Sequence, residues 1–142
     1  MRAGWVTAAA PGPAILPTMT TGSQRLGIDG ERAAACWLRR RGWRIAARRW
    51  RSGRRDLDLV AIHGDLVAFV EVKARRRNEF GGPIEAVGWR KRRELQRSAS
   101  CWIDRHGAPG QSYRFDVIGV LLTPGSVRVR HVADAFAVPV SG

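Results

Sequence analysis

The chain has 142 residues, of which 44% are hydrophobic and 8% aromatic. It is therefore long enough for one domain with a buried core and too apolar to be disordered throughout. It carries 25 Lys and Arg against 12 Asp and Glu, a net charge of +13, and this excess favours a polyanionic partner such as nucleic acid. No segment approaches the roughly 20 apolar residues of a membrane span, so we expect no membrane partner.

Two features of the sequence bear on the N-terminus and the cellular compartment. Residues 1–22 are rich in Ala, Pro, Gly and Thr, and Pro11 and Pro17 interrupt the apolar stretch that a signal peptide needs. We therefore expect a disordered tail. Cys36 and Cys101 lie too far apart for a zinc motif or a disulfide framework, which favours a reduced, cytoplasmic location with both cysteines in the core.

The first half of the domain is predicted to contain one helix and three strands. Apolar residues at helical spacing predict a helix over residues 26–41, and Gly42 ends it. Strands are predicted over residues 43–50, 56–63 and 66–74, with His63-Gly64-Asp65 as a tight hairpin connection. Residues 66–70 are apolar on both faces, so this strand is expected at the centre of the sheet.

The second half is predicted to contain a loop over residues 75–83, a helix and two more strands. The helix covers residues 87–106, with Leu95, Ala99 and Trp102 on its buried stripe, and the strands cover residues 113–122 and 126–132. The order α-β-β-β-α-β-β predicts an α/β domain over residues 23–136, in which helices flank a central mixed β-sheet. Residues 137–142 are expected to form a C-terminal tail.

Three charged residues of the central hairpin are candidates for catalysis. Glu71 and Lys73 share one strand face, and Asp58 is nearly as far from the turn on the neighbouring strand as Glu71 is. Carboxylates in apolar strands are costly unless they are paired or bind a metal, and Mg²⁺ prefers oxygen ligands. The alternative is that Glu71 and Lys73 form a solvated ion pair of little energetic weight.

Glu31 is a third candidate carboxylate. It precedes Ala34, Ala35 and Leu38 by three, four and seven residues, so it lies on the apolar stripe of the first helix. A glutamate near a helix start is also a favourable partner for the helix dipole or part of a cap. Beside the hairpin carboxylates it becomes a candidate metal ligand or base for the attacking water.

Several motifs along the chain together resemble those of a known family. The resemblance rests on Gly27-x-x-Gly30-Glu31-x-x-Ala34, Asp56-Leu57-Asp58-Leu59-Val60-Ala61, Phe69-Val70-Glu71-Val72-Lys73-Ala74-Arg75, Phe80-Gly81, Glu85-Ala86-Val87, Lys91 and Arg114-Phe115-Asp116-Val117. Over residues 23–136 the chain resembles the YraN-like family of small bacterial proteins. That family is similar to the restriction-endonuclease-like PD-(D/E)xK nucleases and, among these, to archaeal Holliday-junction resolvases.

The resemblance implies a restriction-endonuclease-like fold and phosphodiester hydrolysis with Mg²⁺, for which Mn²⁺ could substitute. It implies Asp58, Glu71 and Glu31 as metal ligands and Glu31, Asp58, Glu71 and Lys73 as the catalytic set. Two departures are visible: Asp56 stands where the family usually has Glu, and Leu57 replaces the proline that the superfamily has before the aspartate. Asp116 lies between apolar residues, which favours a structural ion pair with a neighbouring arginine over catalysis.

Arginine-rich segments flank the candidate site in the sequence. Predicted nucleic-acid-binding residues are Arg54, Arg55, Arg75, Arg76, Arg77, Arg90, Lys91, Arg93 and Arg97. Arginine suits bidentate phosphate contacts, and no base-reading motif is present, so recognition of backbone and shape is expected. Solubility and codon usage are the alternative explanation, since 23 of the 25 cations are arginine.

Together these observations favour a structure-selective DNA endonuclease acting on branched DNA, in which a homodimer would supply two sites by symmetry. One alternative is a non-catalytic nucleic-acid-binding module of the same fold, and another is an RNA-processing or ribosome-associated role for the same basic surface. Nothing in the sequence separates DNA from RNA.

Overall fold

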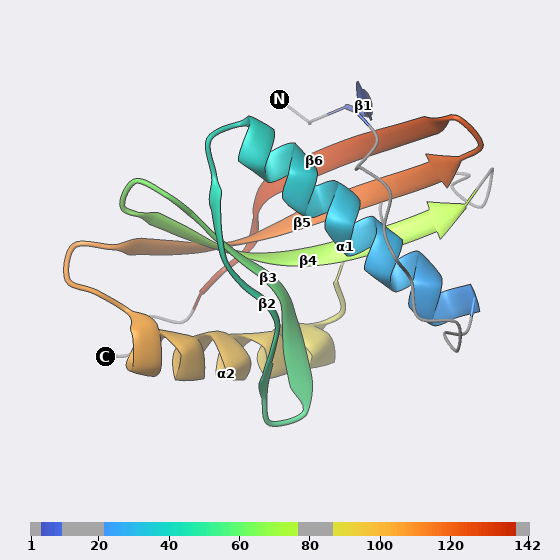
Figure 1. Cartoon of the computed structure of the whole chain (residues 1–142). Helices are drawn as coiled ribbons and strands as arrows, with labels where there is room; N and C mark the ends of the chain where they lie inside the picture. The colour runs from blue at the N-terminus through green and yellow to red at the C-terminus, as the bar shows by residue number, and fades with distance from the viewer. Residues whose placement is uncertain (1–3, 10–21, 77–86, 139–142) are drawn as a thin grey trace.

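The computed structural model of the chain describes residues 4–9, 22–76 and 87–138 (Figure 1). The elements in chain order are β1 (Val6–Ala8), α1 (Gly22–Arg40), β2 (Arg44–Ser52), β3 (Arg55–His63), β4 (Leu66–Arg76), α2 (Trp89–His106), β5 (Ser112–Thr123) and β6 (Ser126–Phe136). Every predicted helix and strand is present, with ends displaced by a few residues. The predicted loop is shorter at its start, because Arg75 and Arg76 still belong to β4, and its remainder lies outside the described residues.

The strands form one mixed sheet in the order β1-β6-β5-β4-β3-β2. Only β4 and β5 run parallel among these pairs, and the chain between them passes through α2. The remaining neighbours are antiparallel. β4 lies between β3 and β5, which confirms its predicted central place, and the architecture is the α/β, restriction-endonuclease-like one that was expected.

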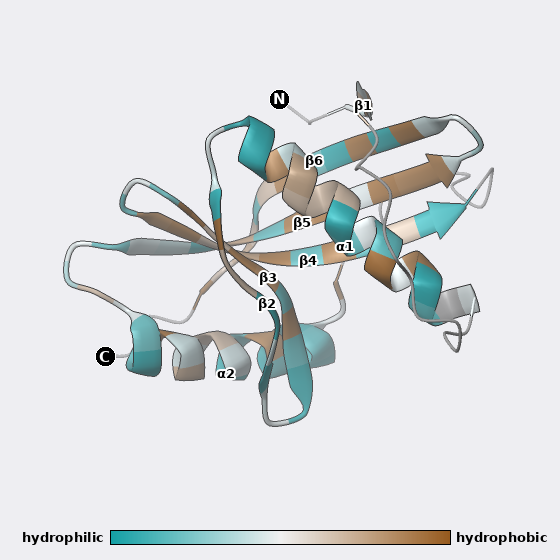
Figure 2. Ribbon diagram, viewed as in Figure 1, coloured by the Kyte–Doolittle hydropathy of each residue, from teal (hydrophilic) through white to brown (hydrophobic). Residues whose placement is uncertain are grey.

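The two helices cover opposite faces of the sheet (Figure 1). On one face, Ala34 and Leu38 of α1 belong to a buried cluster with Val70 and Ile118. On the other face, α2 contributes the predicted stripe of Leu95, Ala99 and Trp102 to a second cluster that includes Phe69 and Phe115. In Figure 2 the hydrophobic residues run along the strands and the helix faces that meet in these two layers. Neighbouring residues of β4 therefore point into different layers, which decides where its charged residues lie.

The strand β1 departs from the prediction for residues 1–22. Val6, Thr7 and Ala8 pair with Val129, Arg128 and Val127 at the edge of the sheet. Three residues are too few to show a periodic pattern, and β6 supplies the hydrogen-bonding partner that fixes this strand. Residues 10–21 lie outside the described part of the chain.

Both cysteines are free thiols, but neither lies in the core, so that part of the prediction is wrong. Cys36 is half-buried on α1, where its sulfur accepts a hydrogen bond from Arg40 Nε at 3.4 Å. Among the described residues, no helix is both long and apolar enough to span a membrane.

Candidate functional site

The candidate site lies where β3 separates from β4. The pairing of these strands ends at Leu59 and Val70, whereas β4 continues to Arg76 alongside β5. Beyond the last pair, the β2–β3 hairpin curves away from the sheet (Figure 1). Asp58 is the neighbour of Leu59 on the side where β3 no longer pairs with β4. Its Oδ2 accepts a hydrogen bond from the Val72 backbone N–H at 2.8 Å. A carboxylate thus replaces a strand carbonyl and is fixed beside Glu71 and Lys73.

Arg49 lies opposite Asp58 and is distorted. It sits between the pairs Arg48–Leu59 and Trp50–Leu57, and its φ of 46° is in the left-handed region that non-glycine residues rarely adopt. Its guanidinium Nε lies 2.7 Å from Glu31 Oε2 and 3.2 Å from Oε1. The irregular strand therefore directs a cation toward the acid of α1 at the edge of the site.

Close packing of α1 against β4 brings Glu31 to the site. A Cβ on Gly30 would lie 2.4 Å from the Cβ of Ala74, so only glycine allows this approach without a shift. The Glu31 side chain is 15% exposed and lines the same pocket as Asp58. The predicted third carboxylate is thus brought to the site, but its oxygens already accept hydrogen bonds from Arg49.

Asp58 and Glu71 form a pair of neighbouring acids. Burial, followed by the negative charge of Glu71, raises the pKa of Asp58 from 3.8 to about 8, against the opposing hydrogen bond from Val72. Glu31 adds a smaller contribution in the same direction. Two carboxylates that cannot both ionise easily form a site that a cation would stabilise.

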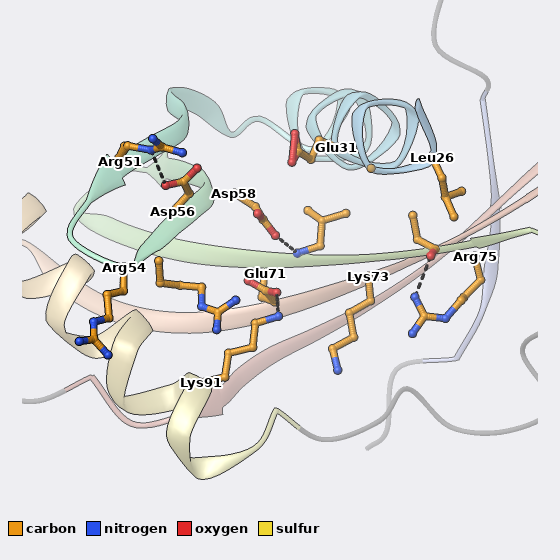
Figure 3. A pocket seen from close by; sticks show the side chains of 14 residues that line it. Leu26, Glu31, Arg51, Arg54, Asp56, Asp58, Glu71, Lys73, Arg75 and Lys91 are labelled. Carbon is orange, nitrogen blue, oxygen red and sulfur yellow. Dashed lines mark hydrogen bonds and ion pairs between the residues drawn. The ribbon is translucent and has the colours of Figure 1, made fainter. Parts of the chain in front are cut away.

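Lys91 supplies one such cation from α2. Its Nζ forms an ion pair with Glu71 Oε1, and the side chains of the two residues are 33% and 7% exposed. Figure 3 shows the lysine reaching Glu71 from α2, on the opposite side from Glu31 of α1. Lys91, a predicted nucleic-acid-binding residue, thus also contacts a predicted metal ligand.

These groups line one pocket with a volume of about 670 Å³. All four predicted catalytic residues, Glu31, Asp58, Glu71 and Lys73, contribute to its wall (Figure 3). Lys73 is half-buried and lies two residues from Glu71 on the same face of β4, as predicted. Both lysines of the chain line this pocket, although 23 of its 25 cations are arginine.

The predicted nucleic-acid-binding residues divide into three groups. Arg54, Arg55, Arg75 and Lys91 line the pocket. A second group is exposed on α2 outside it and consists of Arg90, Arg93 and Arg97. The third group is Arg76 alone, whose Nη2 lies 3.6 Å from Oδ2 of Asp29 on α1. Arg77 lies outside the described residues.

Side chains of α2 and the β2–β3 hairpin form hydrogen bonds that hold the hairpin against the helix, and Arg55 of this contact lines the pocket. Arg55 donates to Glu94 Oε2 at 2.7 and 3.0 Å, and Ser98 Oγ donates to the backbone carbonyls of Arg55 and Ser52 at 2.6 and 3.0 Å. Arg55 is thus committed to an ion pair within the fold. Asp56, at the position where the family usually has Glu, pairs with Arg51 at 3.3 Å.

The described residues contain no group of three or more His, Cys, Asp or Glu side chains arranged to hold a metal ion. Both oxygens of Glu31, the third carboxylate of this pocket, accept hydrogen bonds from Arg49. Asp58 and Glu71 alone could still serve, because Mg²⁺ in proteins is often held by one or two carboxylates, with waters and phosphate oxygens completing its shell.

The profile of the uncharacterised protein family UPF0102, the YraN family, matches residues 30–120. The chain belongs to this family. It is 48% identical over 102 residues to a UPF0102 protein of Nocardia farcinica, covering 72% of this chain and 80% of the relative. It is 44% identical over 115 residues to one of Anaeromyxobacter dehalogenans, covering 81% and 86%. The matched region contains all four predicted catalytic residues and Lys91.

Two contacts of the site were not predicted from the sequence, those of Arg49 with Glu31 and of Lys91 with Glu71. Arg49 is one of nine arginines between residues 39 and 55, and nothing in that run marks it as the partner of Glu31. Lys91 carried a usable signal, since a chain with only two lysines places both of them in the recognised motifs. The sequence could not show which face of α2 would present it.

Proposed function

We propose that this member of the UPF0102 family is a Mg²⁺-dependent nucleic-acid phosphodiester hydrolase, for which Mn²⁺ could substitute. The finer proposal is a structure-selective DNA endonuclease resembling Holliday-junction resolvases. One observation carries it: Asp58 and Glu71 meet at the β3–β4 split, in a pocket that also contains Glu31 and Lys73. No other arrangement in the described residues offers comparable chemistry.

Asp58 and Glu71 fit a divalent cation. Asp58 accepts a hydrogen bond from the Val72 N–H, Glu71 pairs with Lys91, and the two acids share a side-chain hydrogen bond and oppose each other's ionisation. When bound there, the metal would lower the pKa of a coordinated water and stabilise negative charge on the phosphoryl group. Glu31, oriented by Arg49, is assigned to accepting a hydrogen bond from the attacking water and not to metal coordination.

Lys73 is assigned to orienting that water and to neutralising charge in the transition state. It lies on the pocket wall beside Glu71, and its ammonium is a compact cation on a flexible stem. Charge-stabilising groups of this kind act most strongly in a partly dehydrated pocket. In this role Lys73 lowers the barrier of the cleavage step at the reacting phosphate. The exposed arginines instead attract the DNA backbone and contribute to binding affinity.

The arginines support a polyanionic substrate. Arg54 and Arg75 are exposed on the pocket wall. Three more exposed arginines lie on α2, the helix that carries the pocket residue Lys91, and they are Arg90, Arg93 and Arg97. They offer bidentate contacts to phosphates without a device for reading bases. A junction requires two cuts, so we propose that a homodimer supplies two pockets by symmetry.

A second candidate function is a non-catalytic nucleic-acid-binding module, acting on DNA or RNA. The observation that favours it is the pair of ion pairs Glu31–Arg49 and Glu71–Lys91, which neutralise two of the three acids without a metal. In that case the arginine surface alone would carry the function.

The experiment is cleavage of labelled duplex, four-way junction, flap, single-stranded DNA and RNA with Mg²⁺ or Mn²⁺. We expect cleavage of branched DNA by the parent and its loss in Asp58→Asn and Glu71→Gln, with binding retained. Asp104→Asn, an exposed change on α2, is the matched control and should cut at the parent rate. A parent that binds but cuts none of these substrates would support the binding module instead.

A further inference from the structure

The ion pair between Lys91 and Glu71 presents a conflict for a metal site. Lys91 Nζ contacts Glu71 Oε1, and the Glu71 side chain is only 7% exposed. A divalent cation held by this buried carboxylate would share its surroundings with an ammonium group, and the two positive charges would repel each other. Because Lys91 occupies Glu71 Oε1 itself, a metal that binds through this oxygen competes with the lysine for it.

The fold allows the lysine to leave without disturbing the helix that carries it. α2 is anchored by the buried residues Leu95, Ala99 and Trp102 and by the contact of Glu94 with Arg55. Lys91 belongs to the first turns of α2, its side chain is 33% exposed, and it borders a pocket of about 670 Å³. The four-carbon stem can therefore swing into the pocket or toward solvent while the backbone stays in place.

The choice of lysine at this position agrees with such a movement. The chain uses arginine for 23 of its 25 cations, and its two lysines are both in this pocket. An arginine would hold the carboxylate with a planar, two-pronged contact that is harder to exchange. Lysine offers a single point of contact to Glu71.

We propose that Lys91 is an exchangeable counterion of Glu71, which neutralises this buried acid while no divalent cation is bound and is displaced from Oε1 when the cation binds. Lys91 is then a positioning residue that sets the metal affinity of the site. This inference rests on the proposed function, because it requires Glu71 to be a metal ligand.

The first test is the affinity of the full-length protein for Mn²⁺ without nucleic acid, measured from the free-ion signal in electron paramagnetic resonance. Lys91→Met should bind Mn²⁺ on the order of tenfold more tightly than the parent, because a competitor is removed. Lys91→Arg should bind more weakly. Arg54→Ala removes a cation from the pocket wall without touching Glu71, and it should change the affinity much less.

The second test uses the lysine count directly. Protein labelled with ¹³C at the lysine ε-carbon gives two side-chain signals, and Lys91→Arg identifies one of them. Addition of Mg²⁺ should shift the Lys91 signal and narrow it as the side chain becomes mobile. Asp58→Asn should abolish this response to Mg²⁺. This measurement keeps the proposal testable if Lys91→Met fails to fold.

The outcomes separate the two proposals. Unchanged or weaker Mn²⁺ affinity in Lys91→Met, with a Lys91 signal that ignores Mg²⁺, would overturn the exchange even if the parent binds metal and cuts DNA. A parent that binds no Mn²⁺ and shows no lysine response would overturn the exchange together with the metal-dependent function. Tighter binding in both Lys91→Met and Arg54→Ala would reduce Lys91 to one of several background charges and would also overturn it.

Discussion

Asp58 and Asp116 both lie at irregular points of the sheet, yet they have opposite surroundings. Asp116 is fully buried and accepts hydrogen bonds from Arg114 at 2.8 and 3.0 Å, from His131 at 2.7 Å and from the Asp134 backbone N–H at 3.0 Å. Burial alone would raise its pKa, but these donors outweigh burial and lower it. The predicted structural ion pair of Asp116 is thereby confirmed.

At the β3–β4 split the balance is reversed. Asp58 accepts a backbone hydrogen bond from Val72, but burial and then the negative charge of Glu71 outweigh this bond and raise its pKa. Both regions contain a residue with positive φ, Arg49 in one and Asp134 in the other. Asp134 turns its N–H toward the buried aspartate, whereas Arg49 turns its guanidinium toward Glu31. The fold can satisfy a buried carboxylate, and at Asp58 it does so incompletely, which is typical of a functional site.

The largest expected effect comes from replacing each aspartate in turn by asparagine, which cannot ionise. Asp116→Asn should lower the free energy of unfolding by about 3–5 kcal/mol, because Arg114 and His131 lose their buried partner. Asp58→Asn should leave the free energy of unfolding in EDTA unchanged or raise it, since the raised pKa of Asp58 already favours a neutral side chain here and the amide never ionises. Urea unfolding at pH 7.5, followed by tryptophan fluorescence, measures both. If the two substitutions lowered the free energy of unfolding equally, Asp58 would be a structural residue like Asp116, and the contrast between the two sites would be wrong.

Substitutions of Lys73 test whether the site around Asp58 carries out catalysis, in contrast to the structural role of Asp116. Lys73→Ala should lower the single-turnover cleavage rate by about 10²–10³-fold while DNA affinity stays within a few-fold, because its charge acts on the transition state. Lys73→Arg should fail almost as badly, since a planar fork cannot take the place of a compact ammonium. A titration of DNA binding accompanies each rate. Cleavage by Lys73→Arg at the parent rate would show that any cation suffices there.

The prediction from sequence succeeded where a periodic pattern was strong. The alternation in β3, the apolar run of β4 and the helical stripe of α2 predicted these elements, and the hairpin spacing predicted the proximity of Asp58 to Glu71. The strand split itself could not be predicted, because it follows from β4 continuing alongside β5 after β3 has turned away. The short β1 was missed for a similar reason, as its partner strand lies more than a hundred residues away in the sequence.

The residues of the site divide in the same way. Glu31, Asp58, Glu71 and Lys73 could be singled out because charged residues stand out on apolar elements, and the structure brings all four to one pocket. The cations that pair with these acids could not be chosen from the sequence. Any of many arginines could have reached Glu31, and the distorted backbone of Arg49 decides the partner.

The pH dependence of stability should differ between the two aspartates when EDTA removes divalent cations. Asp58 has a higher pKa in the folded chain than its usual 3.8, so the folded state binds more protons between pH 4 and about 8 and stability falls as the pH rises through that window. Asp116 has a lowered pKa, so its contribution is present above pH 4 and is lost only at lower pH.

Melting temperatures from pH 4 to 8.5 test this difference. The parent should lose several degrees between pH 5 and 8 relative to Asp58→Asn, at roughly 2–4 °C for each kcal/mol. Mg²⁺ should reduce the loss in the parent but not in Asp58→Asn. Identical pH profiles for parent and Asp58→Asn would mean that Asp58 ionises normally, which would contradict the contrast with Asp116.

The smallest effect concerns the exposed arginines of α2, which belong to neither carboxylate cluster. If about six phosphates are contacted, the logarithm of DNA affinity should fall with the logarithm of salt concentration with a slope of about −5, from ~0.9 per contact. Replacing Arg90, Arg93 and Arg97 together by alanine should make the slope shallower by up to about 2.7, because three contacts are lost. Stability should hardly change, since all three side chains are exposed. Arg128→Ala, an exposed change on β6 near the β1 edge of the sheet, is the control. A slope that the triple change leaves untouched would place the DNA on another face, and the pocket arginines Arg54 and Arg75 would be the next to replace.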